Sequence, residues 1–429
     1  MTVTQIVRLS CAPNHYHWGK VGKASKVALL AISDPDFSFD SNKHYSELWM
    51  GTHPNGMSFT FDNKQLSLEE FIEADPKAIL GQNIAEKYNN KLPFLYKVLS
   101  VETALSIQAH PGKKLAQRLH KAFPDLYKDP NHKPEMAIAI SDFEALSGFR
   151  PLEDIIAFLT DFPELSSLLG SEVSKEFIQT ATSDSATIKE KQAALKAIFS
   201  ILMKKDPESI KEQLSALIKR TQPLLASNSD PVLHTVHKLN IQYPNDVGVF
   251  CVFFLNLIHL KPGEGFFMGA NEPHAYLYGD CVECMATSDN VVRAGLTPKF
   301  RDVDTLVDMV HYFYGPAKEK IFSPKPWKNG PDAPESKYTM FYNPNIEEFS
   351  MVMSRLPSDA SDELVIGGPS ILTVTDGSGS ITSLSKTFDL KTGYTYFIPA
   401  NTTFTVSTGS NEILTTYTAF CDDKKSSSY

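Results

Sequence analysis

The sequence predicts a mainly β protein with a helical insertion, in which the strands form two related jelly-roll or barrel domains. Two observations lead to this prediction. Short apolar runs broken by Gly, Pro, Asn and Asp occupy residues 1–150 and return after about residue 247, whereas residues 151–246 have the spacing of amphipathic helices. In addition, one strand, turn and strand unit occurs twice in the chain.

The first 150 residues are expected to form strands, for example at KVALLAI (26–32) and FLYKVLSV (94–101). The segment SIQAHPGKK (106–114) is predicted to contain a strand end, because Pro111 disfavours the α-helical conformation at His110 and pushes it toward extended geometry. Side chains alternate along a strand, so Ser106, Gln108 and His110 share one face. A solvated edge strand would explain this pattern too, unless other segments supply matching groups.

A second proline acts in the same way in NHKPEMAIAI (131–140). Pro134 biases the preceding residue toward extended geometry, and Glu135 then shares a strand face with Ala137 and Ala139. These small side chains leave room beside the carboxylate.

Residues 151–246 are predicted to be helical. In TIKEKQAALKAIFSILMKK (187–205) the apolar residues fall on one helix face, and Thr187 with Glu190 fits a capping box. In DPESIKEQLSALIKR (206–220), Asp206 suits the N-cap and Pro207 suits the first helical position.

The repeated unit links two distant parts of the chain. LKPGEGFFMGANEPHAYLYG (260–279) aligns without gaps on LKTGYTYFIPANTTFTVSTG (390–409), and Gly263 with Gly393 and Asn271 with Asn401 are among the matching residues. A duplicated β unit explains the match and implies two related domains, although convergent turn chemistry would also repeat Gly and Asn. The first copy has His274 where the second has Phe404. We therefore expect the first domain to hold a site and the second to be structural or a lid.

Composition narrows the classes of ligand. The 429 residues are 42% hydrophobic and carry a formal net charge of −9, so no overall basic field attracts nucleic acid or an anionic membrane, and an anionic ligand needs local Lys or Arg. Residues 1–10 lack a signal-peptide pattern, and the longest apolar run, VGVFCVFFLNLIHL (247–260), is too short to span a bilayer. Five cysteines give no disulfide framework, and we expect Cys281 and Cys284 to pack in a strand. We expect a cytoplasmic protein that binds a small molecule and neither nucleic acid nor membrane. A monomer is expected as well, although composition does not settle the oligomeric state.

Three segments supply candidate metal ligands: Gln108 with His110, then Glu135, then His274 in NEPHAYLYG (271–279). Two imidazoles, one carboxylate and one amide oxygen suit a first-row divalent metal with an open coordination position. Zinc, manganese, iron and nickel all remain candidates on this chemistry. Taken singly, a solvated strand charge at Glu135 and a turn residue at His274 would be the favoured interpretations.

Several long motifs resemble the signature blocks of the type I mannose-6-phosphate isomerases in their eukaryotic, fungal-like form: SIQAHPGKKLA (106–116), DPNHKPEMAIAI (129–140), NEPHAYLYGDCVECMATSDNVVRAGLTPK (271–299) and WGK (18–20). The resemblance covers nearly the whole chain. It implies two cupin-like jelly-roll barrels plus an α-helical domain, divided as a catalytic barrel (1–150 and 247–325), a helical domain (151–246) and a C-terminal barrel without metal ligands (326–429).

The resemblance also implies a function and a site. The family interconverts mannose 6-phosphate and fructose 6-phosphate, which implies a supply of mannose donors for glycosylation and cell-wall synthesis. It binds one zinc ion through positions that fall here on Gln108, His110, Glu135 and His274. An arginine regarded as catalytic in the family falls on Arg293.

The chemistry is expected to move a proton between C2 and C1 of the open-chain sugar through a cis-enediol. The proton carrier stays open among His132, Lys133, Glu283 and Lys299, which all lie in the matched motifs; we favour Glu283 as base and Lys133 as a donor to a substrate oxygen. His132 and Lys299 are further candidates for binding substrate. A lysine and a hydroxyl suit a phosphate, so we expect Lys97 and Ser106 to contact it.

Two other functions remain open at the level of sequence. Two histidines and a carboxylate on a barrel also describe an iron oxygenase, although Gln108 and Arg293 fit that class less well. A sensor that binds a sugar phosphate without converting it would need the same residues.

Overall fold

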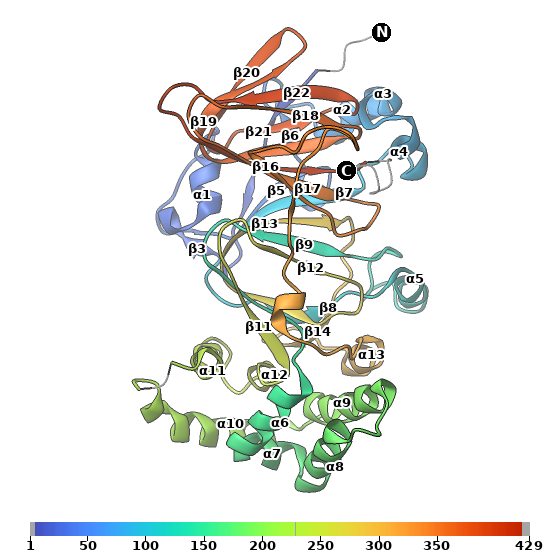
Figure 1. Cartoon of the computed structure of the whole chain (residues 1–429), viewed down its shortest axis with the longest axis vertical. Helices are drawn as coiled ribbons and strands as arrows, with labels where there is room; N and C mark the ends of the chain where they lie inside the picture. The colour runs from blue at the N-terminus through green and yellow to red at the C-terminus, as the bar shows by residue number, and fades with distance from the viewer. Residues whose placement is uncertain (1–4, 228, 423–429) are drawn as a thin grey trace.

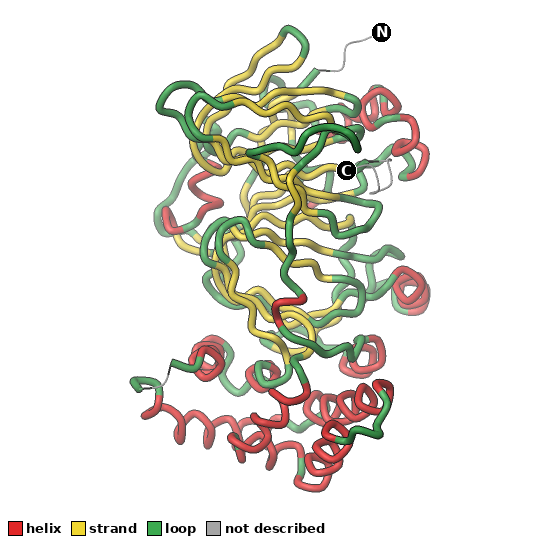
Figure 2. Tube along the Cα trace, in the orientation of Figure 1, coloured by secondary structure: helices red, strands yellow, loops and turns green. Residues whose placement is uncertain are grey.

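Two large antiparallel sheets and a block of helices are stacked along the long axis of the computed structural model, which describes residues 5–227 and 229–422 (Figure 1). The C-terminal sheet lies at one end, the helical block at the other, and a sheet built from both sides of the helical insertion lies between them. Figure 2 shows the same division, with most of the helices gathered at one end. A mainly β fold with a helical insertion is therefore confirmed.

The middle sheet has ten strands and is organised around β13 (His274–Ala286), which pairs with four others. The remaining strands are β2 (Pro13–Asn14), β5 (Glu47–Met50), β7 (Phe94–Val101), β8 (Ile107–Ala109), β9 (Glu135–Ala139), β10 (Phe143–Phe149), β11 (Leu255–Leu260), β12 (Gly265–Met268) and β14 (Val292–Gly295). β3 (Lys20–Val21) and β4 (His44–Tyr45) form a separate pair.

The C-terminal sheet has eleven strands. They are β1 (Val7–Ser10), β6 (Phe59–Thr60), β15 (Lys325–Pro326), β16 (Thr339–Tyr342), β17 (Ser350–Leu356), β18 (Ser361–Ile366), β19 (Ser370–Ser383), β20 (Lys386–Lys391), β21 (Thr395–Ile398), β22 (Thr402–Ser407) and β23 (Leu414–Phe420). β1 pairs with β21, so the start of the described chain completes the C-terminal sheet.

The helical block contains α6 (Leu152–Asp161), α7 (Pro163–Leu169), α8 (Ser171–Thr182), α9 (Ile188–Met203), α10 (Pro207–Thr221), α11 (Pro231–Gln242) and α12 (Gly248–Cys251). The predicted capping box at the start of α9 is confirmed, because the Thr187 hydroxyl accepts from the Glu190 amide and the Glu190 carboxylate accepts from the Thr187 amide. The Asp206 cap of α10 is confirmed as well. The helical block was expected to end at 246, whereas α12 continues it to Cys251 before β11 begins.

Other helices interrupt the region that was expected to be strands: α1 (Lys26–Ala31), α2 (Leu68–Ala74), α3 (Pro76–Leu80), α4 (Gln82–Lys87) and α5 (Lys113–Ala122). The remaining helical elements are α13 (Val303–Met309) and the 3-10 turns η1 (Gly22–Ala24), η2 (Pro54–Gly56), η3 (Gln222–Leu224) and η4 (Ala317–Glu319). The prediction of a strand at KVALLAI was wrong. Ser25 caps a helix there, and its hydroxyl accepts from the Ala28 amide. A short apolar run fits a buried helix as well as a strand, so its spacing could not decide between them.

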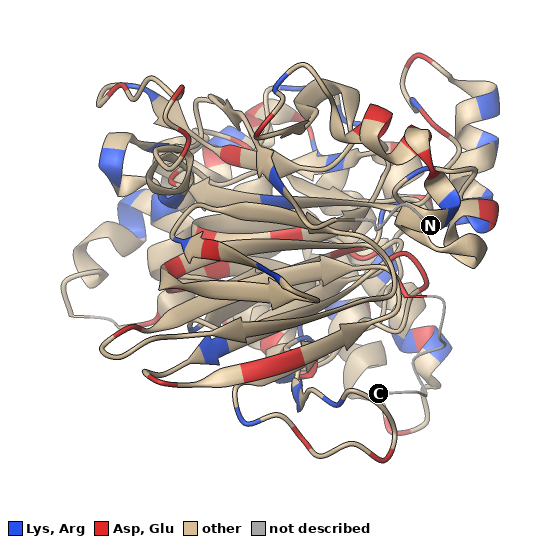
Figure 3. Ribbon diagram, turned by 90° about the horizontal axis from the view of Figure 1, so that it is seen from above, with Lys and Arg blue, Asp and Glu red and all other residues tan. Residues whose placement is uncertain are grey.

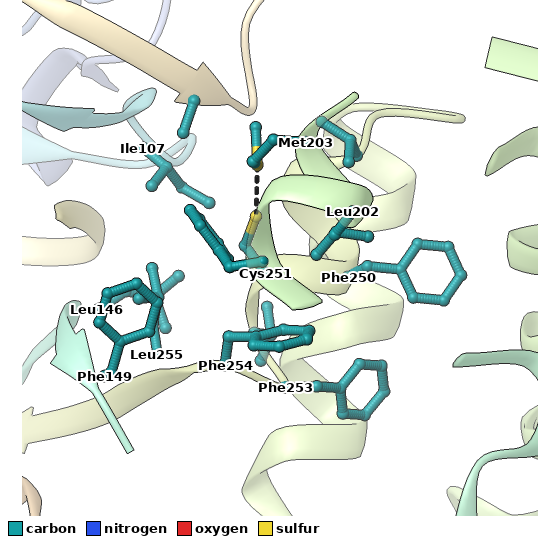
Figure 4. Packing of buried hydrophobic residues seen from close by; sticks show 14 of the residues in the cluster. Ile107, Leu146, Phe149, Leu202, Met203, Phe250, Cys251, Phe253, Phe254 and Leu255 are labelled. Atoms are coloured by element: carbon teal, nitrogen blue, oxygen red, sulfur yellow. Dashed lines mark hydrogen bonds between the residues drawn. The ribbon is translucent and has the colours of Figure 1, made fainter. Parts of the chain in front are cut away.

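The two sheets share one apolar core, which includes Tyr96 on β7, Met136 on β9, Met351 on β17 and Phe397 on β21. A second core joins the middle sheet to the helical block. Ile107 and Phe149 from the sheet pack there with Met203 and Cys251, whose sulfur atoms lie 3.9 Å apart (Figure 4). The apolar face of β8 therefore packs against the helices. Its opposite, polar face carries Gln108.

Both copies of the repeated unit form a strand, a turn and a strand, as predicted. The paired glycines Gly263 and Gly393 have φ of 89° and 91°, and the paired asparagines Asn271 and Asn401 have φ of 63° and 57°. Equal left-handed backbone at equivalent positions supports the duplication. Phe404, the counterpart of His274, is buried in the apolar core of the C-terminal sheet.

No helix within residues 5–227 and 229–422 has both the length and the apolar character that crossing a bilayer requires. Viewed from above, basic and acidic residues are interspersed over the helices and loops (Figure 3).

A buried ion pair ties the N-terminal segment to β13. The Lys20 ammonium lies 2.7 Å from Asp280 Oδ2, and both side chains are less than a tenth exposed. The hydroxyls of Ser100 and Ser141 also donate to the Asp280 carboxylate, at 2.6 and 3.0 Å. Each charged group in this network thus has an ion-pair or hydrogen-bond partner within the protein.

Asp280→Asn should lower the free energy of unfolding by about 3–5 kcal/mol, because it leaves the Lys20 ammonium buried without a counter-charge. Chemical denaturation followed by fluorescence would measure the change. Asp142→Asn, at an exposed pair with Lys261, is the matched control and should change stability by no more than about 1 kcal/mol. Equal effects of the two substitutions would contradict the structural role of the buried pair.

Candidate metal centre and active site

Three buried side chains from three strands converge at one point. His110 follows β8 directly, Glu135 opens β9 and His274 opens β13. Glu135 Oε2 lies 3.3 Å from His110 Nε2 and 3.2 Å from His274 Nε2, and one ligand atom from each residue falls within 4.8 Å of the others. Such a set of two imidazoles and a carboxylate can hold a divalent metal.

Main-chain carbonyls fix the orientation of both imidazole rings. His110 Nδ1 lies 2.7 Å from the Asn290 carbonyl oxygen, and His274 Nδ1 lies 2.9 Å from the Glu272 carbonyl oxygen. A carbonyl only accepts, so each Nδ1 carries the proton and each Nε2 presents its lone pair to the shared centre. Both Nε2 atoms are buried without a hydrogen-bond partner among the described residues, which is the arrangement that a metal ion would satisfy.

The charge states of His110 and Glu135 agree with this interpretation. Burial lowers the pKa of His110 to about 4, so the ring is the neutral form that binds metals. Burial alone would raise the pKa of Glu135, but the Lys133 ammonium, at 3.0 Å, outweighs it and holds that pKa well below its usual range.

Gln108 lies beside the three ligands. On one side it pairs in register with His274 of β13, and on the other with Arg293 of β14. Its side chain is half-buried and lines the adjoining cavity. The pairing of β8 with both neighbours thus connects the metal centre to Arg293.

A cavity of about 320 Å³ opens next to the metal centre. Eight of the eleven residues predicted for the site line it: Lys97, Ser106, Gln108, Lys133, Glu135, Glu283, Arg293 and Lys299. His110 and His274 are buried behind this surface. His132 is not among the lining residues, because its Nε2 lies 2.7 Å from Glu348 Oε1 of the C-terminal sheet region; its contact with substrate stays a prediction.

A second carboxylate, Glu283, lies in the cavity with its own partners. Its Oε2 is 3.2 Å from the Lys97 ammonium, and its Oε1 accepts from the Tyr276 hydroxyl at 2.7 Å. Burial raises the pKa of Glu283, although Lys97 opposes the shift. Burial disfavours the charge on Lys97, but Glu47 and Glu283 raise its pKa overall. The pair is therefore a buried carboxylate held by a firmly protonated lysine.

Arg293 differs from the two buried lysines of the cavity. Lys97 and Lys133 each have a carboxylate partner, whereas the ion pairs among the described residues include none for Arg293. Burial lowers its pKa, but a guanidinium stays charged at neutral pH. An unpaired planar cation at the edge of a cavity is suited to an anionic group of a ligand.

The sequence did not single out Glu47 or the partner role of Tyr276. Glu47 is buried on β5, accepts a hydrogen bond from the indole of Trp49 and lines the cavity. The sequence did contain a signal for Glu47, which is the single carboxylate in the otherwise apolar strand ELWM (47–50). The contact between Tyr276 and Glu283 had no such signal, because it depends on the course of β13.

Comparisons of the sequence and of the structure with known proteins identify the same family. A family model described as phosphomannose isomerase type I, catalytic domain, matches residues 6–152, and one described as the helical insertion domain of that family matches residues 168–255. The mannose-6-phosphate isomerase of Aspergillus fumigatus is 42% identical, with 98% of each chain covered. The human mannose-6-phosphate isomerase is also 42% identical and covers 98% of this chain and 100% of its own.

Solved structures agree with the sequence relatives. The mannose 6-phosphate isomerase of Salmonella typhimurium bound to its substrate, fructose 6-phosphate, and to zinc has a TM-score of 0.81 and 28% identity, with 98% of this chain and 100% of that chain covered. A zinc-bound mannose 6-phosphate isomerase has a TM-score of 0.80 over the same shares. Relatives above 40% identity over almost the whole length, two matching domain models and a shared fold show that the chain belongs to the type I phosphomannose isomerases.

Proposed function

We propose that the protein is a zinc-dependent isomerase that interconverts D-mannose 6-phosphate and D-fructose 6-phosphate through a cis-enediol. The observation that carries this proposal is the convergence of three buried metal ligands, a buried carboxylate and an unpaired arginine on one cavity. Relatives named mannose-6-phosphate isomerase, and the related structure bound to fructose 6-phosphate and zinc, support the substrate and the metal.

Gln108, His110, Glu135 and His274 would hold the metal. The short distances among His110, Glu135 and His274 support three of the four, and Gln108 is their neighbour in the sheet. A bound zinc ion supplies Lewis-acid polarisation of the sugar oxygens. With one carboxylate among the ligands the site keeps a net positive charge, which favours a substrate that develops negative charge.

Glu283 is proposed to carry the proton. Its carboxylate would take the proton from C2 of the open-chain aldose and return it to C1 of the enediol, while the hydroxyl proton passes from O2 to O1, so the protein gains no net proton. Burial, which raises its pKa toward neutrality, makes this carboxylate a stronger base than an exposed one. Lys133, which lines the same cavity, would donate to a substrate oxygen.

Arg293 is proposed to hold or stabilise the anionic part of the substrate, with Ser106 and Lys299 as further contacts on the cavity wall. We expected Lys97 to contact the phosphate. It forms an ion pair with Glu283 and would act on the substrate while it remains in that ion pair. Each of these assignments depends on the position of the residue in the cavity and on its charge.

The proposal extends to the whole molecule. The two sheets would be cupin-like jelly-roll barrels, with the catalytic one formed by 1–150 and 247–325, the helical domain by 151–246 and the C-terminal one by 326–429. We also propose that the enzyme is monomeric and cytoplasmic and that it supplies mannose donors for glycosylation and cell-wall synthesis.

The purified protein should convert mannose 6-phosphate to fructose 6-phosphate, lose this activity on chelation and regain it when zinc returns. The reason is that the metal polarises the oxygens between which the proton moves. A coupled assay for fructose 6-phosphate measures all three states. Full activity in metal-free protein, or none in zinc-loaded protein, would contradict the proposed function.

His110→Ala should lose bound zinc and keep less than about 1% of the activity, since it removes one ligand from a buried set. Metal analysis together with the coupled assay checks both effects. His259→Ala on β11, where the side chain is half-exposed, is the control and should retain both zinc and activity. Zinc bound at wild-type affinity in the His110 variant would exclude the proposed ligand set.

Arg293→Ala should lower kcat/KM by roughly 10²- to 10³-fold while the protein still binds zinc, because it removes a charge that meets the substrate but no metal ligand. Steady-state kinetics and metal analysis would separate the two properties. Arg118→Ala, at an exposed position of α5, should behave as wild type. Loss of zinc from the Arg293 variant would mean that its role is to build the centre.

A further inference from the structure

The segment that joins α11 to α12 near the end of the helical block, residues 242–248, contacts both walls of the cavity. On the first wall, the Tyr243 hydroxyl donates to the Ala104 carbonyl oxygen at 2.6 Å, and Gln242 Oε1 accepts from the Ala104 amide at 3.0 Å. Ala104 and Tyr243 both line the cavity, and Ser106 follows two residues later. The helical block is thus bonded directly to the stretch that leads into β8.

On the second wall, the Asp246 carboxylate binds the turn that follows Arg293. Its Oδ1 accepts from the Leu296 amide at 2.7 Å, and its Oδ2 accepts from the Thr297 amide at 3.3 Å. Oδ1 also accepts from the Gly248 amide at 2.6 Å, which holds the carboxylate in its own loop. Leu296 and Thr297 line the cavity, so Asp246 acts on this wall from outside it.

The turn that Asp246 holds has an unusual backbone. Leu296 has a φ of 53°, in the left-handed region that bulky side chains rarely adopt, and its side chain is nevertheless buried. A residue in this conformation persists only when its surroundings impose it. Two charge-assisted hydrogen bonds to consecutive amides are such a constraint, and within the described part of the chain no other side chain accepts from these two amides.

The two segments also touch without a side chain between them. A Cβ built on Gly295 would lie 2.6 Å from Gly248 Cα, and one built on Gly248 would lie 2.6 Å from the Leu296 amide nitrogen. Backbone meets backbone here, so a displacement of the 246–248 loop would move the end of β14. Arg293 lies on this strand, two residues before Gly295.

We propose that Asp246 is a positioning residue for substrate binding: from the exit of the helical block it fixes the left-handed turn at Leu296 and thereby the 293–299 wall that carries Arg293 and Lys299. The inference rests on the proposed function for the identity of the ligand, a sugar phosphate. It gives the helical insertion a role in shaping the substrate site.

Asp246→Ala tests this inference. It should raise both KM for mannose 6-phosphate and the Kd of zinc-loaded protein for fructose 6-phosphate at least about tenfold, with unchanged zinc content, because the turn loses its acceptors. Steady-state kinetics, titration calorimetry and metal analysis give the three values. Asp308→Ala is the matched control, since the exposed Asp308 also joins the helical block to α13, through Lys196 at 2.9 Å, but does not contact the turn; it should leave all three values unchanged.

Asp246→Asn gives a second variant if the alanine protein does not fold. Its amide keeps one oxygen for Leu296 but sets a donor against the Thr297 amide, so a smaller rise in KM and Kd is expected. Unchanged KM and Kd in the folded variants would overturn the inference, even if the melting temperature or kcat falls, because that result describes a purely structural residue. Wild-type protein that binds fructose 6-phosphate without converting mannose 6-phosphate, and whose binding Asp246→Ala still weakens, would count against the proposed function and leave the positioning role intact.

Discussion

The pairing of β13 with four neighbouring strands is the constraint on which the rest of the site depends. Its first residue, His274, lies opposite Gln108 of β8, and further along the strand Glu283 lies opposite Lys97 of β7. β9, which begins at Glu135, pairs with the same strand. Hydrogen-bonded register thus brings groups separated by more than a hundred residues into one cavity, and main-chain geometry sets their spacing before any ligand binds.

Electrostatic balance lets this cavity bury so many ionisable groups. Glu135 has Lys133 and Glu283 has Lys97 within hydrogen-bond distance, while Glu47 accepts a hydrogen bond from the Trp49 indole. Unpaired buried charges would shift their pKa values until they became neutral. Half-buried Arg293 and exposed Lys299 line the cavity without an ion pair among the described residues, where an anionic ligand can reach them. The distribution of pairs therefore separates groups that keep the site together from those that are free to bind.

The helical insertion stabilises the site through both packing and hydrogen bonds. Ile107, between the site residues Ser106 and Gln108, is buried in the core that the helices share with the sheet (Figure 4). The chain that leaves the helices then binds Ala104 on one wall and Leu296 on the other. The insertion thus holds two walls of the cavity through hydrogen bonds to their main chain.

The sequence by itself determined the features that act over a few residues: the strand end at His110, the extended residue Lys133 before β9, the caps of α9 and α10, and the turns of the repeated unit. Long motifs also identified the metal ligands and Arg293 as candidates. The sequence could not show that β1 joins the C-terminal sheet or that KVALLA is a helix, because both depend on what packs against them. Tyr276 and Glu283 are seven residues apart, which in a regular strand places them on opposite faces. A register shift near Gly279, whose φ of 113° suits glycine, brings both into the cavity. Only the tertiary structure decided that contact, because an irregularity in strand pairing is set by the neighbouring strand and not by local spacing.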